Sequence, residues 1–155
     1  MTVFLVRHGS AGHRDDSDPS DDLRPLDERG RRQADDLVEL LADRRVVAVG
    51  SSPATRCVET VAPLARVRGI DVEIAVELFE GADVDAAWAL VDAAARRDGD
   101  TVLWSHGDVI PDLIRRAQLR GMEVPGKRGC SKGSVWALHV DGEQITRGSY
   151  TPLPG

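Results

Sequence analysis

An apolar run at the start of the chain stops abruptly at a cation, an imidazole and a glycine. Val3–Val6 contains four consecutive apolar residues, and Arg7, His8 and Gly9 follow it directly. Such a run predicts a short strand that is covered on both faces, as in a parallel sheet. Ligands bind at the carboxyl ends of the strands in open α/β sheets, so we expect Arg7 and His8 to lie at a binding site. The triplet alone is equally consistent with a structural histidine beside a surface arginine.

A second strand followed by a helix is expected in the middle of the chain. Val46–Val49 is another buried apolar run, and Pro53 stands at the expected first helical position with Ser52 as the N-cap. Pro63 should kink or end this helix, because proline has no backbone N–H to donate. Arg56 would lie in the first turn, where the helix dipole disfavours a cation. An anion shared by Arg56 and the helix N-terminus would explain this position, and a solvated side chain is the alternative.

The opening pattern recurs near residue 100. Thr101–Ser105 is typical of a buried strand; it ends in His106 and Gly107, and Asp108 can cap the helix that follows. If the three strands are parallel neighbours, their carboxyl ends bring together four side chains, those of Arg7, His8, Arg56 and His106. Backbone N–H groups near Gly9 and Gly107 would lie at the same edge of the sheet.

The other segments complete an α/β fold. Helices are expected from the cap Asp27 through Leu41 and from about Asp83 to Arg97, because apolar residues recur there at helical spacing. Asp71–Ile74 is typical of an exposed edge strand, and Asp141-Gly142 between two strand-like runs is a hairpin signal. We therefore expect one mixed sheet with helices on both faces, in a chain of 155 residues that fits a single domain.

Composition narrows the class of protein. The formal net charge is −6, from 26 acidic and 20 basic residues, which disfavours non-specific attraction to nucleic acid or to an anionic membrane. Aromatic residues make up 4% of the chain, too few for a platform on which single-stranded nucleic acid would stack. Neither a signal peptide nor a membrane span is evident, and Cys57 and Cys130 fit no disulfide framework, so we expect a cytoplasmic protein.

A polar loop is expected over Ser10–Pro25. It contains five aspartates whose spacing fits no calcium-binding pattern, which favours a solvated acidic loop. Arg14 in this loop can reach toward His8. A metalloenzyme that uses His8, His13 and His106 is a weaker alternative, because no carboxylate or cysteine stands at a helpful spacing.

The four side chains at the strand ends suit one dianionic phosphoryl group. Two guanidiniums can each offer a planar fork to phosphate oxygens. One imidazole can attack phosphorus in line to form a phosphohistidine, while the other stabilises the developing charge. The arginines would neutralise charge as magnesium does in other phosphoryl-transfer enzymes, so the expected chemistry requires no metal.

Three segments, in this order, resemble the motifs of the histidine phosphatase superfamily, which includes the phosphoglycerate mutases. They are Arg7-His8-Gly9, the Ser52–Thr60 segment and Ser105-His106-Gly107. The resemblance covers essentially the whole chain and implies a three-layer α/β/α sandwich around a mixed, mostly parallel sheet, with no cofactor. It also implies that His8 is the nucleophile and that Arg7 and Arg56 clamp the phosphate. His106 would be the second histidine of the pocket.

The resemblance also suggests a proton donor. Family members that cleave phosphomonoesters usually take it from a Leu-x-Glu loop, and Leu78-Phe79-Glu80 stands where that loop should be. Glu80 is therefore the candidate general acid. Glu77 and Asp108 are alternatives, because the acid must reach the leaving oxygen. A solvated loop carboxylate without a catalytic role also fits Glu80.

Other features distinguish between groups within the superfamily. Phosphoglycerate mutases have a Glu where Ser10 stands and a much longer chain, which argues against mutase activity. The short chain and Arg24-Pro25-Leu26 resemble the small phosphohistidine phosphatases that act on proteins. Asp108–Ile114 and Lys132–Trp136 resemble the C-terminal phosphatase-like domain of actinobacterial two-domain MutT (Nudix) hydrolases, although no Nudix box occurs in this sequence.

These observations predict a metal-independent phosphatase that works through a phosphorylated His8. Its substrate would be a phosphorylated small molecule, a nucleotide or a phosphohistidine protein. The alternative is a low-turnover module that binds a phosphorylated ligand and partners a nucleotide hydrolase. The cations of Lys127–Lys132 can hold a second phosphate. The expected substrate-binding residues are Gly9, Ser10, Arg14, Gly107 and Lys132.

Overall fold

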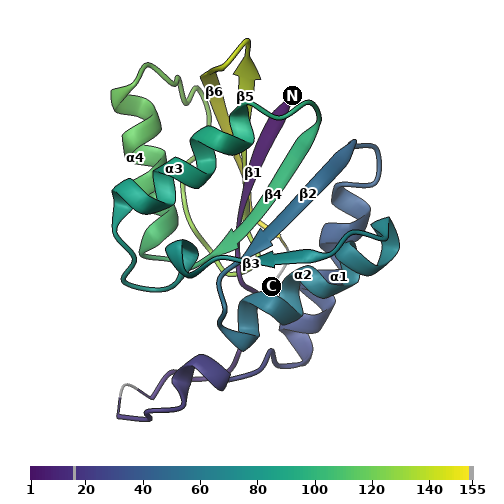
Figure 1. Ribbon diagram of the computed structural model, residues 1–155. Coiled ribbons are helices and arrows are strands. Elements are labelled where there is room, and N and C mark those ends of the chain that lie inside the picture. Colours follow the sequence, from purple (N-terminus) through teal and green to yellow (C-terminus); the bar gives the residue numbers. More distant parts are fainter. Residues whose placement is uncertain (16, 154–155) are drawn as a thin grey trace.

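The computed structural model describes residues 1–15 and 17–153, which form a six-stranded sheet in the order β3-β2-β4-β1-β5-β6 (Figure 1). Four strands are parallel to one another: β1 (Thr2–Arg7), β2 (Val46–Ser51), β3 (Val72–Ile74) and β4 (Asp100–Ser105). A hairpin of β5 (Val135–Asp141) and β6 (Gln144–Thr151) completes the sheet, with β5 antiparallel to β1. The expected mixed, mostly parallel sheet and the C-terminal hairpin are confirmed.

Four helices of the described chain cover the two faces of the sheet and give three layers (Figure 1). One face carries α1 (Glu28–Leu40) and α2 (Thr55–Arg68), and the other carries α3 (Val84–Ala95) and α4 (Val109–Leu119). Two loops contain short 3-10 helices, η1 (Asp21–Leu23) and η2 (Val76–Leu78). The expected three-layer sandwich is confirmed. Among the described residues, no helix is both long and apolar enough to cross a lipid bilayer.

The central strand β1 alternates its side chains between two hydrophobic clusters. Val3 and Leu5 pack with residues of α3 and α4, whereas Phe4 and Val6 pack with residues of α1 and α2. All four side chains are buried. Every position in this run must be apolar because both faces of the strand are covered. The buried strand fixes the point at which the chain leaves the sheet as Arg7 and His8.

The start of α2 differs from the prediction. The helix begins at Thr55 rather than at Pro53, and its N-cap position is Ala54 instead of Ser52. The Ser52 hydroxyl accepts a hydrogen bond from the Ala54 N–H at 3.3 Å and lies 2.8 Å from a ring nitrogen of His106. A serine before a proline is typical of an N-cap, but here its hydroxyl is used in a tertiary contact.

Of the two effects expected of Pro63, a kink or the end of the helix, the structure excludes the second. Pro63 does not end the helix, which continues to Arg68. The missing N–H frees the carbonyl of Glu59, an exposed residue, so water can replace the lost hydrogen bond. The other helices follow the prediction more closely: Asp27 is confirmed as the N-cap of α1, and α3 ends at Ala95, two residues before the expected end.

Candidate active site

A cavity of about 390 Å³ lies where β1 and β4 end, beside the first turn of α2. Its wall carries five cationic side chains, an imidazole and two carboxylates, together with two glycines. These residues are Arg7, His8, Gly12, Arg14, Arg24, Arg56, Glu80, Gly107, Asp108 and Lys132. The parallel pairing of β1 with β4, and of β4 with β2, brings these distant segments to one edge of the sheet.

His8 is held as a neutral imidazole. Its Nδ1 lies 2.8 Å from the carbonyl oxygen of Gly9, which can only accept a hydrogen bond, so Nδ1 carries the proton and Nε2 carries the lone pair. Burial lowers the pKa of His8 to about 3, and repulsion from the protonated form of His106 and from Arg56 and Arg7 acts in the same direction. The ring is therefore uncharged at neutral pH and retains a nucleophilic nitrogen.

Arg7 and Arg56 present guanidiniums to the cavity. Arg7 Nη1 donates to the carbonyl oxygen of Cys130 at 2.7 Å, and the fully buried Arg56 donates from Nη1 to that of Asp21 at 2.9 Å. Within the described residues, the Nε atom of each arginine is buried without an acceptor. A buried donor left unpaired costs about 1–3 kcal/mol, and two guanidiniums beside one cavity favour an oxyanion as its ligand.

A glycine allows Arg7 to take this position. A Cβ atom at Gly107 would stand 2.7 Å from Cζ of Arg7, too close for any other residue unless the guanidinium moved. The glycine after His106 is thus explained by a close approach between the end of β4 and the arginine side chain of β1.

His106 lies behind the cavity wall. Its ring centroid is 5.4 Å from that of His8, its Nε2 is 2.8 Å from the Ser52 hydroxyl, and its Nδ1 is 3.5 Å from Nη2 of Arg56. A guanidinium can only donate, so Nδ1 accepts and Nε2–H donates to Ser52. Burial, with Arg56 as the next cause, lowers the pKa of His106 to about 4. Ser52 and Arg56 therefore fix the orientation of this ring.

Glu80 and Arg14 form an ion pair at the cavity. Both carboxylate oxygens of Glu80 accept from Arg14, at 2.8 Å for the Nη2–Oε2 pair, and Oε2 also lies 3.7 Å from Nη2 of Arg56. The hydrogen bonds from Arg14 hold the pKa of Glu80 below its usual value, so the carboxylate is ionised. Of the two alternative acids, Asp108 lines the cavity and accepts from the Gly81 N–H at 2.7 Å, whereas Glu77 lies in η2, outside the cavity wall.

The backbone of Gly9 and Ser10 faces the protein rather than the cavity. Gly9 donates its N–H to the Thr60 hydroxyl at 3.0 Å, and that hydroxyl donates to the carbonyl of Arg56 at 2.6 Å. Ser10 donates its hydroxyl to Asp27 at 2.7 Å. Thr60 thus ties the loop that holds His8 to the helix turn that holds Arg56.

The structural roles of Thr60, Ser52 and Arg24 were not predicted from the sequence. Arg24 lines the cavity and donates to the carbonyl of Ala11 at 2.7 Å, and its only signal was the Arg24-Pro25-Leu26 resemblance. His13 is exposed and lies outside the cavity wall. Among the described residues, no group of three His, Cys, Asp or Glu side chains is arranged to hold a metal ion.

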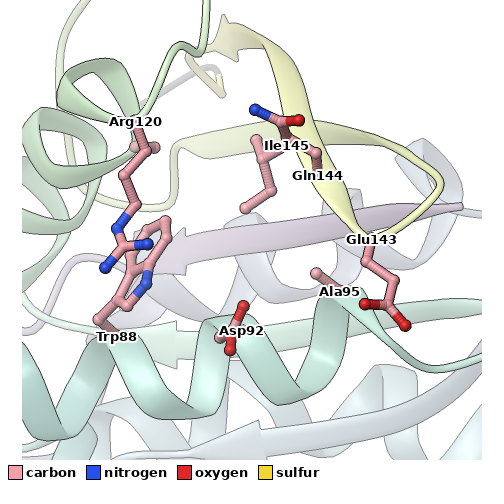
Figure 2. A pocket seen from close by; sticks show the side chains of 8 residues that line it. Trp88, Asp92, Ala95, Arg120, Glu143, Gln144 and Ile145 are labelled. Atoms are coloured by element: carbon pink, nitrogen blue, oxygen red, sulfur yellow. The ribbon is translucent and has the colours of Figure 1, made fainter.

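A second cavity, of about 290 Å³, lies between α3, α4 and the turn of the β5–β6 hairpin (Figure 2). Because Thr2 pairs with His139 near that turn, this cavity stands at the amino end of β1, opposite the candidate active site. The Arg120 guanidinium lies over the Trp88 ring, 5.5 Å from its centroid. The carboxylates of Asp92 and Glu143 on the wall are each 3.4 Å from Arg96.

Solved structures share this fold. The protein histidine phosphatase SixA in complex with tungstate matches with a TM-score of 0.75 at 21% sequence identity, over 97% of this chain and 94% of that protein. A mycobacterial glucosyl-3-phosphoglycerate phosphatase matches with a TM-score of 0.71 at 18% identity, over 97% and 96% of the two chains. These likenesses establish the phosphoglycerate mutase-like fold.

Sequence comparison identifies the family. An 8-oxo-(d)GTP phosphatase of Mycolicibacterium smegmatis is 34% identical over 156 residues, which cover 99% of this chain and 48% of that relative. The chain thus spans about half the length of that relative. Residues 3–85, the segment that supplies Arg7, His8 and Arg56, match the Histidine phosphatase superfamily (branch 1). This match covers more than half of the chain, and the chain therefore belongs to the histidine phosphatase superfamily.

Proposed function

We propose that this protein is a phosphatase that transfers the phosphoryl group of its substrate first to Nε2 of His8 and then to water. The observation that carries the proposal is a neutral, buried His8 whose Nδ1 is bound to the carbonyl oxygen of Gly9, in a cavity with two guanidiniums that retain unpaired Nε–H groups. The lone pair on Nε2 supports nucleophilic attack, and the guanidiniums support stabilisation of the developing charge.

The proposed reaction has two steps. First, Nε2 of His8 attacks phosphorus, the bond between phosphorus and the leaving oxygen breaks, and Glu80 gives that oxygen a proton. Then water attacks the phosphohistidine, the phosphorus–nitrogen bond breaks, and Glu80 takes the proton of the water. Inorganic phosphate is released, and His8 and Glu80 return to their starting forms. Arg7 and Arg56 would hold the nonbridging oxygens throughout.

Glu80 can act as an acid only when protonated, and its ion pair with Arg14 opposes protonation. An incoming phosphoryl dianion competes with Glu80 for Arg14 and for Arg56. Transfer of these guanidiniums to the phosphate would raise the pKa of Glu80 and allow it to take up a proton. The substrate would thereby prepare its own proton donor. Asp108, which also lines the cavity, is the alternative acid.

The substrate class is a phosphorylated small molecule, a nucleotide or a phosphohistidine protein. The names of similar proteins support this range, since they include an 8-oxo-(d)GTP phosphatase, a protein histidine phosphatase and a glucosyl-3-phosphoglycerate phosphatase. A cavity of about 390 Å³ also leaves room for a leaving group beside the phosphoryl group. The free thiols of Cys57 and Cys130 support action in a reducing cytoplasm.

The central test is phosphoenzyme trapping combined with turnover of p-nitrophenyl phosphate in the presence of a chelator. We expect an acid-labile phosphoenzyme in the wild type and none in His8→Ala, with turnover reduced at least about a thousandfold. His139→Ala is the matched control, because His139 is exposed on β5, away from the cavity. Full turnover in His8→Ala would exclude His8 as the nucleophile.

A second candidate function is a phospho-ligand binding module with little turnover that partners a nucleotide hydrolase. The observation that favours it is that the match covers 48% of the 8-oxo-(d)GTP phosphatase relative, so in that protein the matching region stands beside a further segment. Tight binding of phosphate without a trapped phosphoenzyme or turnover would favour the module over the phosphatase.

A further inference from the structure

A smaller cavity of about 220 Å³ adjoins the candidate active site, and the Lys132 side chain lines both. Its other lining residues are Ser10, Arg29, Gln33, Ser131 and Leu153. The described residues of the wall combine two cations, two hydroxyls and an amide, and none of them carries a carboxylate. The Ser10 hydroxyl and the Gln33 amide already donate to Asp27 and to the carbonyl of Lys132, and the Ser131 hydroxyl bonds to Tyr150. The two cations are therefore the groups that suit an anion.

The backbone beside Lys132 is fixed relative to the nucleophile. The next residue, Gly133, donates its N–H to the carbonyl oxygen of His8 at 2.9 Å. Gln33, which is 2% exposed, donates to the carbonyl of Lys132 at 3.1 Å and accepts from the N–H of Ser10 at 2.8 Å. These bonds hold the backbone at Lys132 against both the end of β1 and α1, and the exposed Lys132 side chain extends from this fixed point.

The cations of this wall are not neutralised by ion pairs. Within the described residues, no carboxylate lies within ion-pair distance of Arg29 or Lys132, whereas Arg32 on the same helix lies 3.5 Å from Glu28. Asp27 is the acidic group whose pKa Lys132 helps to lower. Its oxygens already accept from the Ser10 hydroxyl and from the N–H groups of Gly12 and Gly30. The positive charge of the wall therefore remains available to a ligand.

We propose that this cavity is a second phosphate subsite, which selects substrates that carry one phosphate for transfer to His8 and a second phosphate held by Arg29 and Lys132. The inference rests on the phosphatase function proposed above and adds its substrate class, a small-molecule bisphosphate. The cations of Lys127–Lys132 were expected to hold a second phosphate, and the proposal assigns this role to Lys132 alone. Of the cations in that segment, Lys132 lines the cavity, whereas Arg128 donates to Gln118 on α4.

The test compares fructose bisphosphate with fructose monophosphate at constant ionic strength. We expect the wild type to prefer the bisphosphate in kcat/KM by about tenfold or more, beyond the twofold advantage of having two phosphates. Arg29→Gln should remove most of this preference. Arg32→Gln is the matched control on the same helix, and its preference should equal that of the wild type. A preference that survives Arg29→Gln would overturn the subsite.

Calorimetric titration of the His8→Asn variant with the same two compounds separates this proposal from the proposed function. In one outcome, the wild type turns over neither compound, but His8→Asn binds the bisphosphate about tenfold more tightly than the monophosphate, and adding Arg29→Gln abolishes this difference in affinity. The subsite then holds and the phosphatase proposal fails. If both compounds are turned over at equal kcat/KM and bind equally, the subsite is wrong and the phosphatase proposal stands.

Discussion

Cavities at the two ends of the sheet both contain arginine side chains, but these arginines differ in what they contact. At the carboxyl ends of β1 and β4, Arg7 and Arg56 keep buried Nε–H groups without acceptors in the described part of the chain. At the opposite end, Arg120 stacks on Trp88 (Figure 2). The cavity's carboxylates, those of Asp92 and Glu143, both pair with the neighbouring Arg96. The charges of the second cavity are thus paired within the protein.

The difference shows that a cluster of charges does not by itself indicate a site. Burial without pairing costs free energy, and a fold keeps such groups where a ligand or a reaction requires them. The first cavity has the costly arrangement, because Arg7 and Arg56 each keep a buried Nε–H without an acceptor, although Arg56 also pairs with Asp21 and Glu80. Beside them lie two imidazoles of lowered pKa, that of His8 in the wall and that of His106 behind it. Four predictions, beginning with the largest effect, test whether the unpaired donors of the first cavity, and not the paired charges of the second, determine activity.

Arg56→Lys should lower kcat/KM for p-nitrophenyl phosphate at least about a hundredfold, a loss typical of removing one donor to the transition state. Lysine keeps the charge but loses the planar fork, and its ammonium cannot bond both Asp21 and a phosphate oxygen with the same geometry. Steady-state kinetics measure the effect, and the thermal midpoint of unfolding controls for folding. Unchanged kcat/KM in a folded variant would remove Arg56 from the phosphate clamp.

Glu80→Gln should lower turnover of an alkyl phosphate about a hundredfold but that of p-nitrophenyl phosphate less than about tenfold. A good leaving group departs without a proton, so only the poor one requires the acid. The ratio of the kcat values for the two substrates, compared between variant and wild type, measures this selective loss. Glu77→Gln is the matched control in the same loop, and Asp108→Asn tests the alternative. If Asp108→Asn alone shows the selective loss, the acid is Asp108.

The free energy of unfolding should fall as the pH drops below about 6.5, the usual pKa of histidine. In the folded protein, the pKa values of His8 and His106 are about 3 and about 4, so over this range the unfolded chain binds more protons. Each histidine then contributes a slope of up to about 1.4 kcal/mol per pH unit, lost as the pH falls toward the folded pKa.

Urea unfolding of the wild type and of His106→Asn at several pH values measures this slope. The variant lacks one of the two buried imidazoles, so its stability should depend less steeply on pH than that of the wild type. Equal slopes would show that His106 binds protons similarly in the folded and unfolded states, and the burial argument for its neutral form would be wrong.

The sequence predicted those parts of the site that depend on local patterns. The apolar run before Arg7 requires a strand covered on both faces, and parallel packing of such strands places their ends together. The contacts made by loops were not predictable in this way. Arg14 and Glu80 are 66 positions apart, and their pairing depends on how two irregular segments cross the cavity.

Ser52 shows why local rules fail near a site. Its position before a proline fits a helix N-cap, yet its hydroxyl bonds to His106, 54 positions away. Gly30 is a similar case, because a Cβ there would stand 2.0 Å from the carbonyl oxygen of Ser10. The apolar spacing that predicts α1 does not reveal this close contact between Gly30 and the Ser10 backbone. At both positions the residue type is explained by a tertiary contact rather than by the secondary-structure preference of its own segment.

Arg120→Ala provides the smallest expected effect and the sharpest test of the contrast. Loss of the cation–π contact with Trp88 should lower the free energy of unfolding by about 0.5–1 kcal/mol, measured by urea denaturation. The kcat/KM for p-nitrophenyl phosphate should change less than about twofold, because the side chain lies at the other end of the sheet. The same arginine type would then matter for turnover at one end of β1 and for stability alone at the other. A tenfold loss of kcat/KM without further loss of stability would mean that the second cavity is coupled to the first, and the pairing of its charges would need a functional explanation.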